Sequence, residues 1–171
     1  RQLLSLARNE PGALDSMQLQ PLDLNAHALE VSMEWVPQAI KRNIDLGFEG
    51  VDHPLMIDAD QDRLRELVNN LIDNAIRYSQ PGGRVTVQAS RIDDAQCRLA
   101  ISDDGLRIPV EERARIFERF HRMLGTQEDG SGLGLAIVSE IATLHGARIT
   151  LEEDIDGVGN TFSVFFPLRA A

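Results

Sequence analysis

The stretch RLRELVNNLIDNAIRYS, residues 63–79, decides the fold of this chain. Seven apolar residues recur in it at steps of three and four, which predicts an amphipathic helix with one buried face: Leu64, Leu67, Val68, Leu71, Ile72, Ala75 and Ile76. Glu66, Asn70 and Asn74 follow at intervals of four, so their side chains should line one edge of that helix. A solvated flank would explain a single Asn. Here two amides and a carboxylate lie in line and are followed by Arg77 and Tyr78. This pattern indicates a binding surface for a metal ion, a phosphate and a flat ring.

Composition and charge narrow the class of protein. With 171 residues and 43% apolar content, the chain suits one compact α/β domain with a real core. No apolar run is long enough to cross a bilayer, and no secretory signal stands at the N-terminus. The single cysteine, Cys97, excludes a disulfide framework and argues against a thiolate metal site, so we expect a reducing cytoplasm. A net charge of −10 argues against wrapping nucleic acid, and any phosphate site must therefore be local.

Outward from residues 63–79, alternating runs predict strands and periodic runs predict further helices. We expect strands at 22–24, 44–48, 55–57, 85–89, 97–103, 149–153 and 161–166, long helices at 25–41 and 133–145, and a short helix at 109–115. Asn25 should cap the helix at 25–41, which contains Pro37, and Gly146 should close the helix at 133–145. The strands at 44–48 and 55–57 should form a hairpin-like pair. The inward set of the first long helix should be Ala28, Leu29, Ser32, Val36 and Ile40.

Asp103 falls on the inward side of its strand, in register with Cys97, Leu99 and Ile101. A carboxylate on a core face is costly unless it is hydrogen-bonded. Asp also suits turns, so a turn-capping role is the plain alternative. The functional interpretation is a buried acceptor for a ligand donor such as an exocyclic amine.

The stretch GSGLGL, residues 130–135, opens the helix at 133–145. Alternate glycines allow close approach of the backbone, and a helix N-terminus offers N–H groups to a phosphate. Leu135 and Ala136 stand where a P-loop needs Lys and Ser or Thr, and no clear strand leads into the glycines, as a dinucleotide fingerprint requires. Nearby, Arg119 and Arg122 have forked donors suited to a triphosphate, whereas Phe117 should anchor the core.

Together these pieces resemble the catalytic, ATP-binding domain of bacterial sensor histidine kinases, which shares an α/β sandwich with the gyrase, Hsp90 and MutL ATPases. NNLIDNAIRYS (69–79) looks like the N box, DDGLRIP (103–109) like the G1 box and IFERFHR (116–122) like the F box. GSGLGL (130–135) looks like the G2 box and GVGNTFSVFFP (157–167) like a terminal G3 stretch. The similarity covers roughly residues 22–168, with the motifs in the family's order.

The resemblance implies an α/β fold, a two-layer sandwich of a mixed sheet of about five strands packed on three helices, with a flexible ATP lid at about 106–131. It also implies ATP and Mg²⁺ as ligands. Asn74 would hold Mg²⁺ with Asn70 beside it, and Asp103 would accept from the adenine amino group. The nucleotide-binding set that it implies is Asn70, Asn74, Arg77, Tyr78, Asp103, Gly105, Arg119, Arg122, Gly130, Ser131, Gly132, Leu133, Gly134, Leu135 and Thr161.

The catalytic residues implied are Asn70 and, as a weaker candidate base, Glu66. Hydrolytic relatives carry a Glu at the position of Asn70, and an amide cannot take a proton from water. This favours a kinase over an ATPase or a serine kinase of the same fold. The chain departs from the family at Arg107, where the G1 pattern has a second glycine. That departure keeps open a second hypothesis, a degenerate nucleotide-binding or interaction module with impaired turnover.

The resemblance also organises the chain and implies partners. Residues 1–10 look like the end of the second helix of a dimerisation domain, 11–20 like a linker and 21–171 like the catalytic domain. None of the four histidines has the setting of a phosphoacceptor, so the acceptor histidine should lie on a dimerisation domain of the same kinase. A downstream response regulator is the second expected partner. The whole protein should be a homodimer in the bacterial inner membrane with this domain in the cytoplasm, and the fragment alone should be monomeric.

Overall fold

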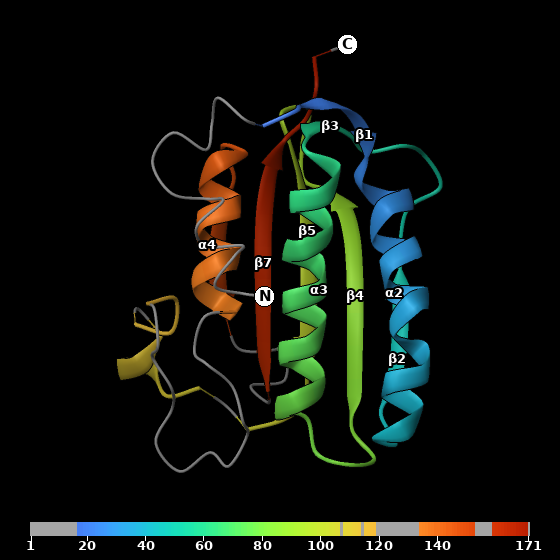
Figure 1. The fold of residues 1–171 in the computed structure, drawn as a ribbon, viewed down its shortest axis with the longest axis vertical. Helices are drawn as coiled ribbons and strands as arrows, with labels where there is room; N and C mark the ends of the chain where they lie inside the picture. Colours follow the sequence, from blue (N-terminus) through green and yellow to red (C-terminus); the bar gives the residue numbers. More distant parts are fainter. Residues whose placement is uncertain (1–16, 107, 114, 119–133, 153–158, 171) are drawn as a thin grey trace.

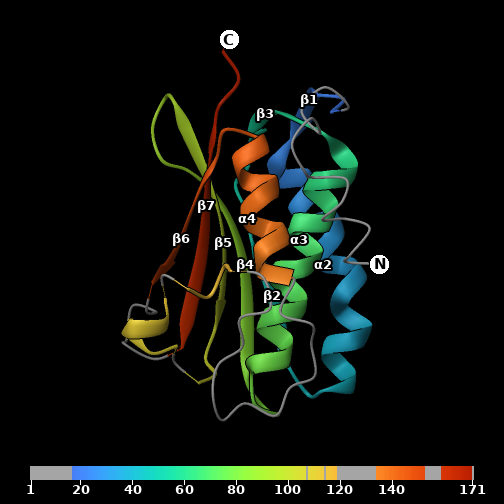
Figure 2. The same ribbon diagram turned by 60° about the vertical axis from the view of Figure 1, so that its left-hand side comes forward.

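Three helices cover one face of a five-stranded sheet in the computed structural model of the protein, which describes residues 17–106, 108–113, 115–118, 134–152 and 159–170 (Figures 1 and 2). The helices are α2 (Leu24–Lys41), α3 (Gln61–Tyr78) and α4 (Gly134–Leu144), with α3 between the other two (Figure 1). The strand order is β2-β4-β5-β7-β6, where β2 runs parallel to β4 and the other pairs are antiparallel. The predicted mixed α/β sandwich is thus confirmed.

The strands of this sheet have the following bounds: β2 Asp45–Glu49, β4 Arg84–Arg91, β5 Gln96–Asp103, β6 Arg148–Glu152 and β7 Asn160–Pro167. A separate two-stranded sheet joins β1 (Gln20–Asp23) to β3 (Met56–Ala59). The predicted short helix at 109–115 is a single 3₁₀ turn, Val110–Glu112, which follows Pro109. The predicted helix end before residue 10, the loop at 123–130 and the turn at 156–157 lie outside the described residues.

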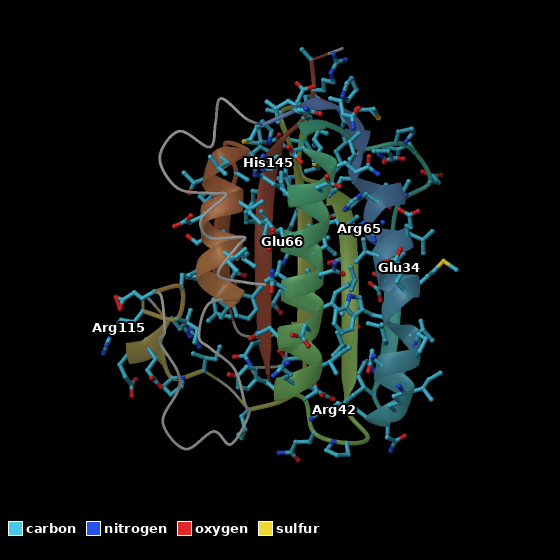
Figure 3. The ribbon with its side chains drawn as sticks, in the orientation of Figure 1. Glu34, Arg42, Arg65, Glu66, Arg115 and His145 are labelled. Atoms are coloured by element: carbon cyan, nitrogen blue, oxygen red, sulfur yellow. The ribbon has the colours of Figure 1, made fainter. Side chains whose placement is uncertain are left out.

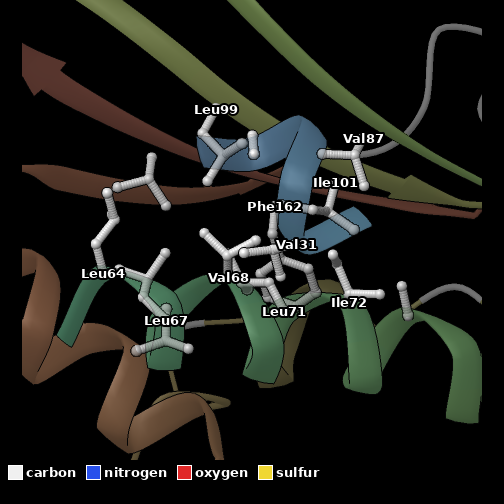
Figure 4. Packing of buried hydrophobic residues seen from close by; sticks show 14 of the residues in the cluster. Val31, Leu64, Leu67, Val68, Leu71, Ile72, Val87, Leu99, Ile101 and Phe162 are labelled. Carbon is white, nitrogen blue, oxygen red and sulfur yellow. The ribbon is translucent and has the colours of Figure 1, made fainter. Parts of the chain in front are cut away.

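The core is built on α3, as its periodicity predicts. All seven apolar residues of its stripe are at most 3% exposed. They pack against inward side chains of the sheet, among them Leu99, Ile101 and Phe162 (Figure 4). Burying one such side chain stabilises the fold by about 1.5–3 kcal/mol. Asp60 is the N-cap of the helix, and its carboxylate accepts the backbone N–H groups of Asp62 and Arg63 at 3.1 Å each.

The orientation of α2 corrects two predictions. Its N-cap is Asp23, which accepts the Asn25 N–H at 3.0 Å, while the Asn25 amide pairs with the backbone of Val51. Leu29, Val36 and Ile40, predicted to face inward, are 41%, 39% and 69% exposed. The helix has apolar residues on two faces, and packing against α3 and the sheet selects the face that carries Leu24, His27, Ala28, Val31, Ser32 and Ala39.

The predicted hairpin of strands 44–48 and 55–57 is wrong. β2 pairs in parallel with β4, and β3 pairs with β1 in the small sheet. Strand alternation shows which face is buried but carries no information on the partner strand, which long-range packing decides. The loop between β2 and β3 is instead held to α2 by the Asn25–Val51 pair.

A buried polar cluster joins α3 to α4 at the end of the domain that also carries β1 and β3 (Figures 1 and 3). His145 donates from Nδ1 to the Ile141 carbonyl at 2.8 Å, and its Nε2 accepts the Asp60 N–H at 3.1 Å. Asp60 also pairs with the Arg63 guanidinium at 3.0 Å and accepts the Gln18 N–H at 3.1 Å. Burial opposes ionisation of Asp60, but these donors outweigh it and lower its pKa. The cluster fixes how the two helices lie side by side.

Among the described residues, no helix combines the length and apolar content that crossing a membrane requires.

Candidate functional site

The opposite end of the domain gathers most of the predicted site residues that the structure describes. Asp103 ends β5 and is 3% exposed, as its strand parity predicts. Its Oδ1 accepts the Gly105 N–H at 2.9 Å and the Asn160 side-chain amide at 3.3 Å. A buried carboxylate is tolerated when donors of this kind converge on it. The predicted turn-capping role is confirmed by the bond from Gly105, while the role as acceptor for a ligand donor stays a prediction.

Two glycines allow the Asp103 turn to be this closely enclosed. A Cβ on Gly105 would collide with the Tyr78 carbonyl at the end of α3. Gly159 has φ +73°, and a Cβ there would collide with the Asp103 carbonyl. The end of α3, the end of β5 and the start of β7 therefore touch backbone to backbone around the carboxylate.

Asn160 is a site residue that sequence reasoning missed. It is the strand partner of Asp103 and is 3% exposed. Asn160 lies two residues before Phe162 in the same strand, so both side chains face the interior. This alternation is the sequence signal that could have identified Asn160 as a buried residue. Thr161, which was predicted instead, points to the other face of the sheet, where its hydroxyl lies 2.9 Å from that of Ser102. A nucleotide-binding role for Thr161 stays a prediction, but the structure does not bring its side chain to Asp103.

The polar edge of α3 lies where the intervals of four place it. Glu66, Asn70 and Asn74 are all half-buried. Asn70 donates from its side-chain nitrogen to the Glu66 carbonyl at 2.9 Å, one turn earlier. Figure 3 shows Glu66 on the side of α3 toward α4, away from Arg65, which pairs with Glu34 of α2 at 2.6 Å. Because Asn70 and Asn74 follow Glu66 at intervals of four on one helix, the amide edge lies on the α4 side of α3 rather than on the α2 side.

At the end of α3, Arg77 and Tyr78 take different positions. The Arg77 Nε lies 3.1 Å from both carboxylate oxygens of Asp73, one turn earlier on the same helix. A phosphate would have to compete with this pair for the guanidinium. Tyr78 is half-buried and packs against the core, while its carbonyl meets Gly105. This places the Tyr78 backbone beside the turn that follows Asp103, while the ring packs against the core.

The start of α4 is the third part of the site. The helix begins at Gly134, and Leu135 packs against the core. The backbone N–H groups of a first helical turn have no carbonyl partners within the helix, so this end can hold an anion. Phe117 packs edge-on against Phe162 at 6.0 Å between ring centroids, as predicted for a core anchor. The remaining predicted ligands lie outside the described residues: Arg119, Arg122, Gly130, Ser131, Gly132 and Leu133, together with Arg107.

The residues present fit a nucleotide with a divalent cation. Asp103 supplies a fixed acceptor, Tyr78 a ring, α3 two amides and α4 a helix N-terminus. A buried acceptor suits the amino group of a purine base, and amide oxygens suit Mg²⁺ when substrate phosphates supply the other ligands. These groups come from three elements, α3, β5 and α4, so the site exists only in the folded domain.

Comparisons with known proteins agree with this geometry. The family model described as histidine kinase-, DNA gyrase B- and HSP90-like ATPase matches residues 59–170. The swarming motility regulation sensor protein RssA of Serratia marcescens is 32% identical over 167 residues, which cover 98% of this chain and 35% of RssA. The solved mycobacterial sensor histidine kinase MprB has a TM-score of 0.77 at 32% identity and covers 90% of this chain and 100% of that chain.

A second solved structure, full-length ShkA in complex with AMPPNP, has a TM-score of 0.83 at 31% identity and covers 99% of this chain and 35% of ShkA. The chain spans about a third of the length of the curated relatives that it matches. The family model covers most of this chain, and MprB is similar over the whole of its solved structure. The protein therefore belongs to the histidine kinase-, DNA gyrase B- and HSP90-like ATPase family, as a catalytic domain of the sensor histidine kinase type.

Proposed function

We propose that this domain binds Mg·ATP and transfers the γ-phosphoryl group to a histidine on a separate dimerisation helix. The observation that carries the proposal is the enclosed Asp103 carboxylate, which accepts two donors in a turn packed against the backbone end of α3. The complex of the similar ShkA with AMPPNP supports an adenine nucleotide as the ligand. The comparisons lend no support to the degenerate module as an alternative.

In this proposal each residue has a stated role. Asp103 accepts a hydrogen bond from the adenine amino group, and the Tyr78 ring lies along the base. Arg77 and the start of α4 meet the phosphates, as do Arg119 and Arg122 from outside the described residues. Mg²⁺, with Asn74 as a ligand and Asn70 beside it, would neutralise charge on the phosphates. Catalysis would then rest on positioning and charge neutralisation, as is usual for phosphoryl transfer.

The amide of Asn70 bears on the reaction type. An amide has no site that can take a proton from water, so the domain holds ATP without activating water against it. Glu66, one turn earlier, is the candidate base for the acceptor imidazole. Two of the four histidines, His27 and His145, are 5% and 7% exposed, so burial disfavours them as acceptors. His53 is exposed beside Asp52, and its exclusion rests on the labelling experiment below.

The wider setting belongs to the same proposal. The relatives are named as sensor proteins and signal-transduction kinases, so a dimerisation domain of the same kinase and a response regulator are the proposed partners. We place this domain on the cytoplasmic side of a membrane-bound homodimer.

Incubation with radiolabelled ATP tests the proposed transfer. The fragment alone should stay unlabelled, and addition of a separate dimerisation domain with its histidine should give an acid-labile label on that domain. The same domain with its histidine replaced by alanine is the control. Acid-labile label on the fragment itself would contradict the need for an external acceptor. Binding of Mg·ATP without transfer to the added domain would favour the degenerate module.

A further inference from the structure

The side-chain amide of Asn160 bridges three parts of the G1 segment. Its Nδ2 donates to the Leu106 carbonyl at 2.7 Å and to Asp103 Oδ1 at 3.3 Å. Its Oδ1 accepts the Ile108 N–H at 2.8 Å. The residue is 3% exposed, and its bonds to Ile108 and Asp103 are buried, while the bond to Leu106 is partly buried. One amide therefore holds the base-reading carboxylate and the backbone on both sides of position 107.

The geometry resembles a peptide group that pairs with a neighbouring strand. The chain contains a second amide that pairs with backbone in this way, because Asn25 donates to the Val51 carbonyl at 3.1 Å and accepts the Val51 N–H at 3.0 Å. Asn25 holds a single residue far from Asp103. Asn160 spans two residues and adds a bond to a carboxylate, so the two amides form a natural comparison.

Loss of the Asn160 amide would remove three hydrogen bonds from the G1 segment. The buried Ile108 N–H would lose its acceptor, the Leu106 carbonyl would lose a short bond, and Asp103 Oδ1 would lose one donor while it keeps the Gly105 N–H. A buried polar group left unpaired moves until it finds a partner or water. The carboxylate would then be held less firmly in one orientation, and the backbone at Leu106 and Ile108 would lose the amide that ties it to β7.

We propose that Asn160 is a positioning residue that sets the base selectivity of the nucleotide site. It acts through Asp103 and through the backbone at Leu106 and Ile108, without being required to touch the base. This inference rests on the proposed function, because it assigns the residue that orients the carboxylate which accepts the adenine amino group.

The test compares Asn160→Asp and Asn160→Ala with Asn25→Asp and Asn25→Ala in the same fragment. Asn160→Asp keeps the acceptor for Ile108 but replaces the donor with a second carboxylate beside Asp103. Affinities for Mg·ATP and Mg·GTP are measured by calorimetry, and exchange of the Ile108 amide is followed by NMR. We expect the ATP-to-GTP affinity ratio to fall about tenfold or more in both Asn160 variants. Ile108 should stay protected in Asn160→Asp and exchange fast in Asn160→Ala.

The Asn25 variants should lose thermal stability while they keep the parent's affinity ratio and Ile108 protection. If Asn160→Asp does not fold, Asn160→Ser, which keeps a short hydroxyl without a second charge, carries the same comparison. An unchanged ATP-to-GTP ratio in the Asn160 variants, with stability lost as in the Asn25 variants, would overturn the inference and leave the proposed function standing. A parent that binds neither nucleotide would overturn both.

Discussion

Replacing Asp103 by Asn is the most direct probe of the proposed base-reading carboxylate. Oδ1 of Asp103 accepts two donors, the Gly105 N–H at 2.9 Å and the Asn160 amide at 3.3 Å. In Asp103→Asn these donors keep the amide oxygen on their side, so the new NH₂ group takes the place of Oδ2. The fold should therefore survive, because both bonds to the backbone and to Asn160 are retained.

The cost should appear in nucleotide binding instead. An NH₂ group that faces the adenine amino group sets a donor against a donor, and the charge-assisted bond is lost. Such a bond is worth about 1.5–3 kcal/mol, which corresponds to roughly a 10- to 150-fold loss of ATP affinity. Guanine carries an oxygen acceptor where adenine carries its amino group, and this oxygen can accept from the new NH₂ group. The ratio of ATP affinity to GTP affinity should therefore fall as well.

Calorimetric titration with Mg·ATP and Mg·GTP measures both effects. Asp104→Asn is the matched control, because Asp104 is exposed and its carboxylate accepts the Arg84 N–H at 3.0 Å outside this network. The melting temperature of both variants should stay near that of the parent. An Asp103→Asn protein that prefers ATP to GTP as strongly as the parent would refute the assignment, and another residue must then read the base.

Three further predictions follow from the site and the core. Asn74→Ala should weaken Mg·ATP binding and leave the fold intact, since the residue is half-buried at the edge of the core; equal Mg·ATP affinity in variant and parent, by calorimetry, would exclude Asn74 as the Mg²⁺ ligand. Arg107→Gly should tighten ATP binding several-fold and increase hydrogen-exchange protection of residues 106–131 with nucleotide. The family pattern has glycine here, and an arginine at a positive φ would cost about 1–2 kcal/mol, more than an exposed charge contact of about 0–1 kcal/mol; looser binding would identify Arg107 as a phosphate ligand. Burial, together with the charge of Arg65, lowers the pKa of His27 from 6.5 to about 4. The unfolded chain therefore binds the proton more strongly than the folded domain does. The free energy of unfolding should fall by about 3 kcal/mol as the pH drops from 6.5 toward 4. His27→Leu should flatten this part of the urea-unfolding profile relative to the parent, and an unchanged slope would show that His27 is not its source.

The sequence by itself determined the central helix, the inward parity of β5 and the order of the site motifs. These features are local, because helical and strand periods place side chains on faces without reference to the rest of the chain. The seven stripe residues of α3 and the burial of Asp103 follow from such counting alone. The resemblance to sensor kinase domains rested on the same short motifs, and the family comparison confirms it.

Only the tertiary structure decided which strands pair, which face of α2 is buried and which residue meets Asp103. β2 joins β4 rather than β3 because strand pairing depends on contacts between residues far apart in the chain. α2 is apolar on two sides, so Leu29 and Ile40 lie exposed while Val31 enters the core, a choice that only the packing partner makes. Asn160 lies 57 residues from Asp103 along the chain, and their hydrogen bond exists because β5 and β7 are neighbours in the sheet. Periodicity predicts on which face of its strand or helix each residue lies. Only the folded sheet brings residues from distant strands together in one site.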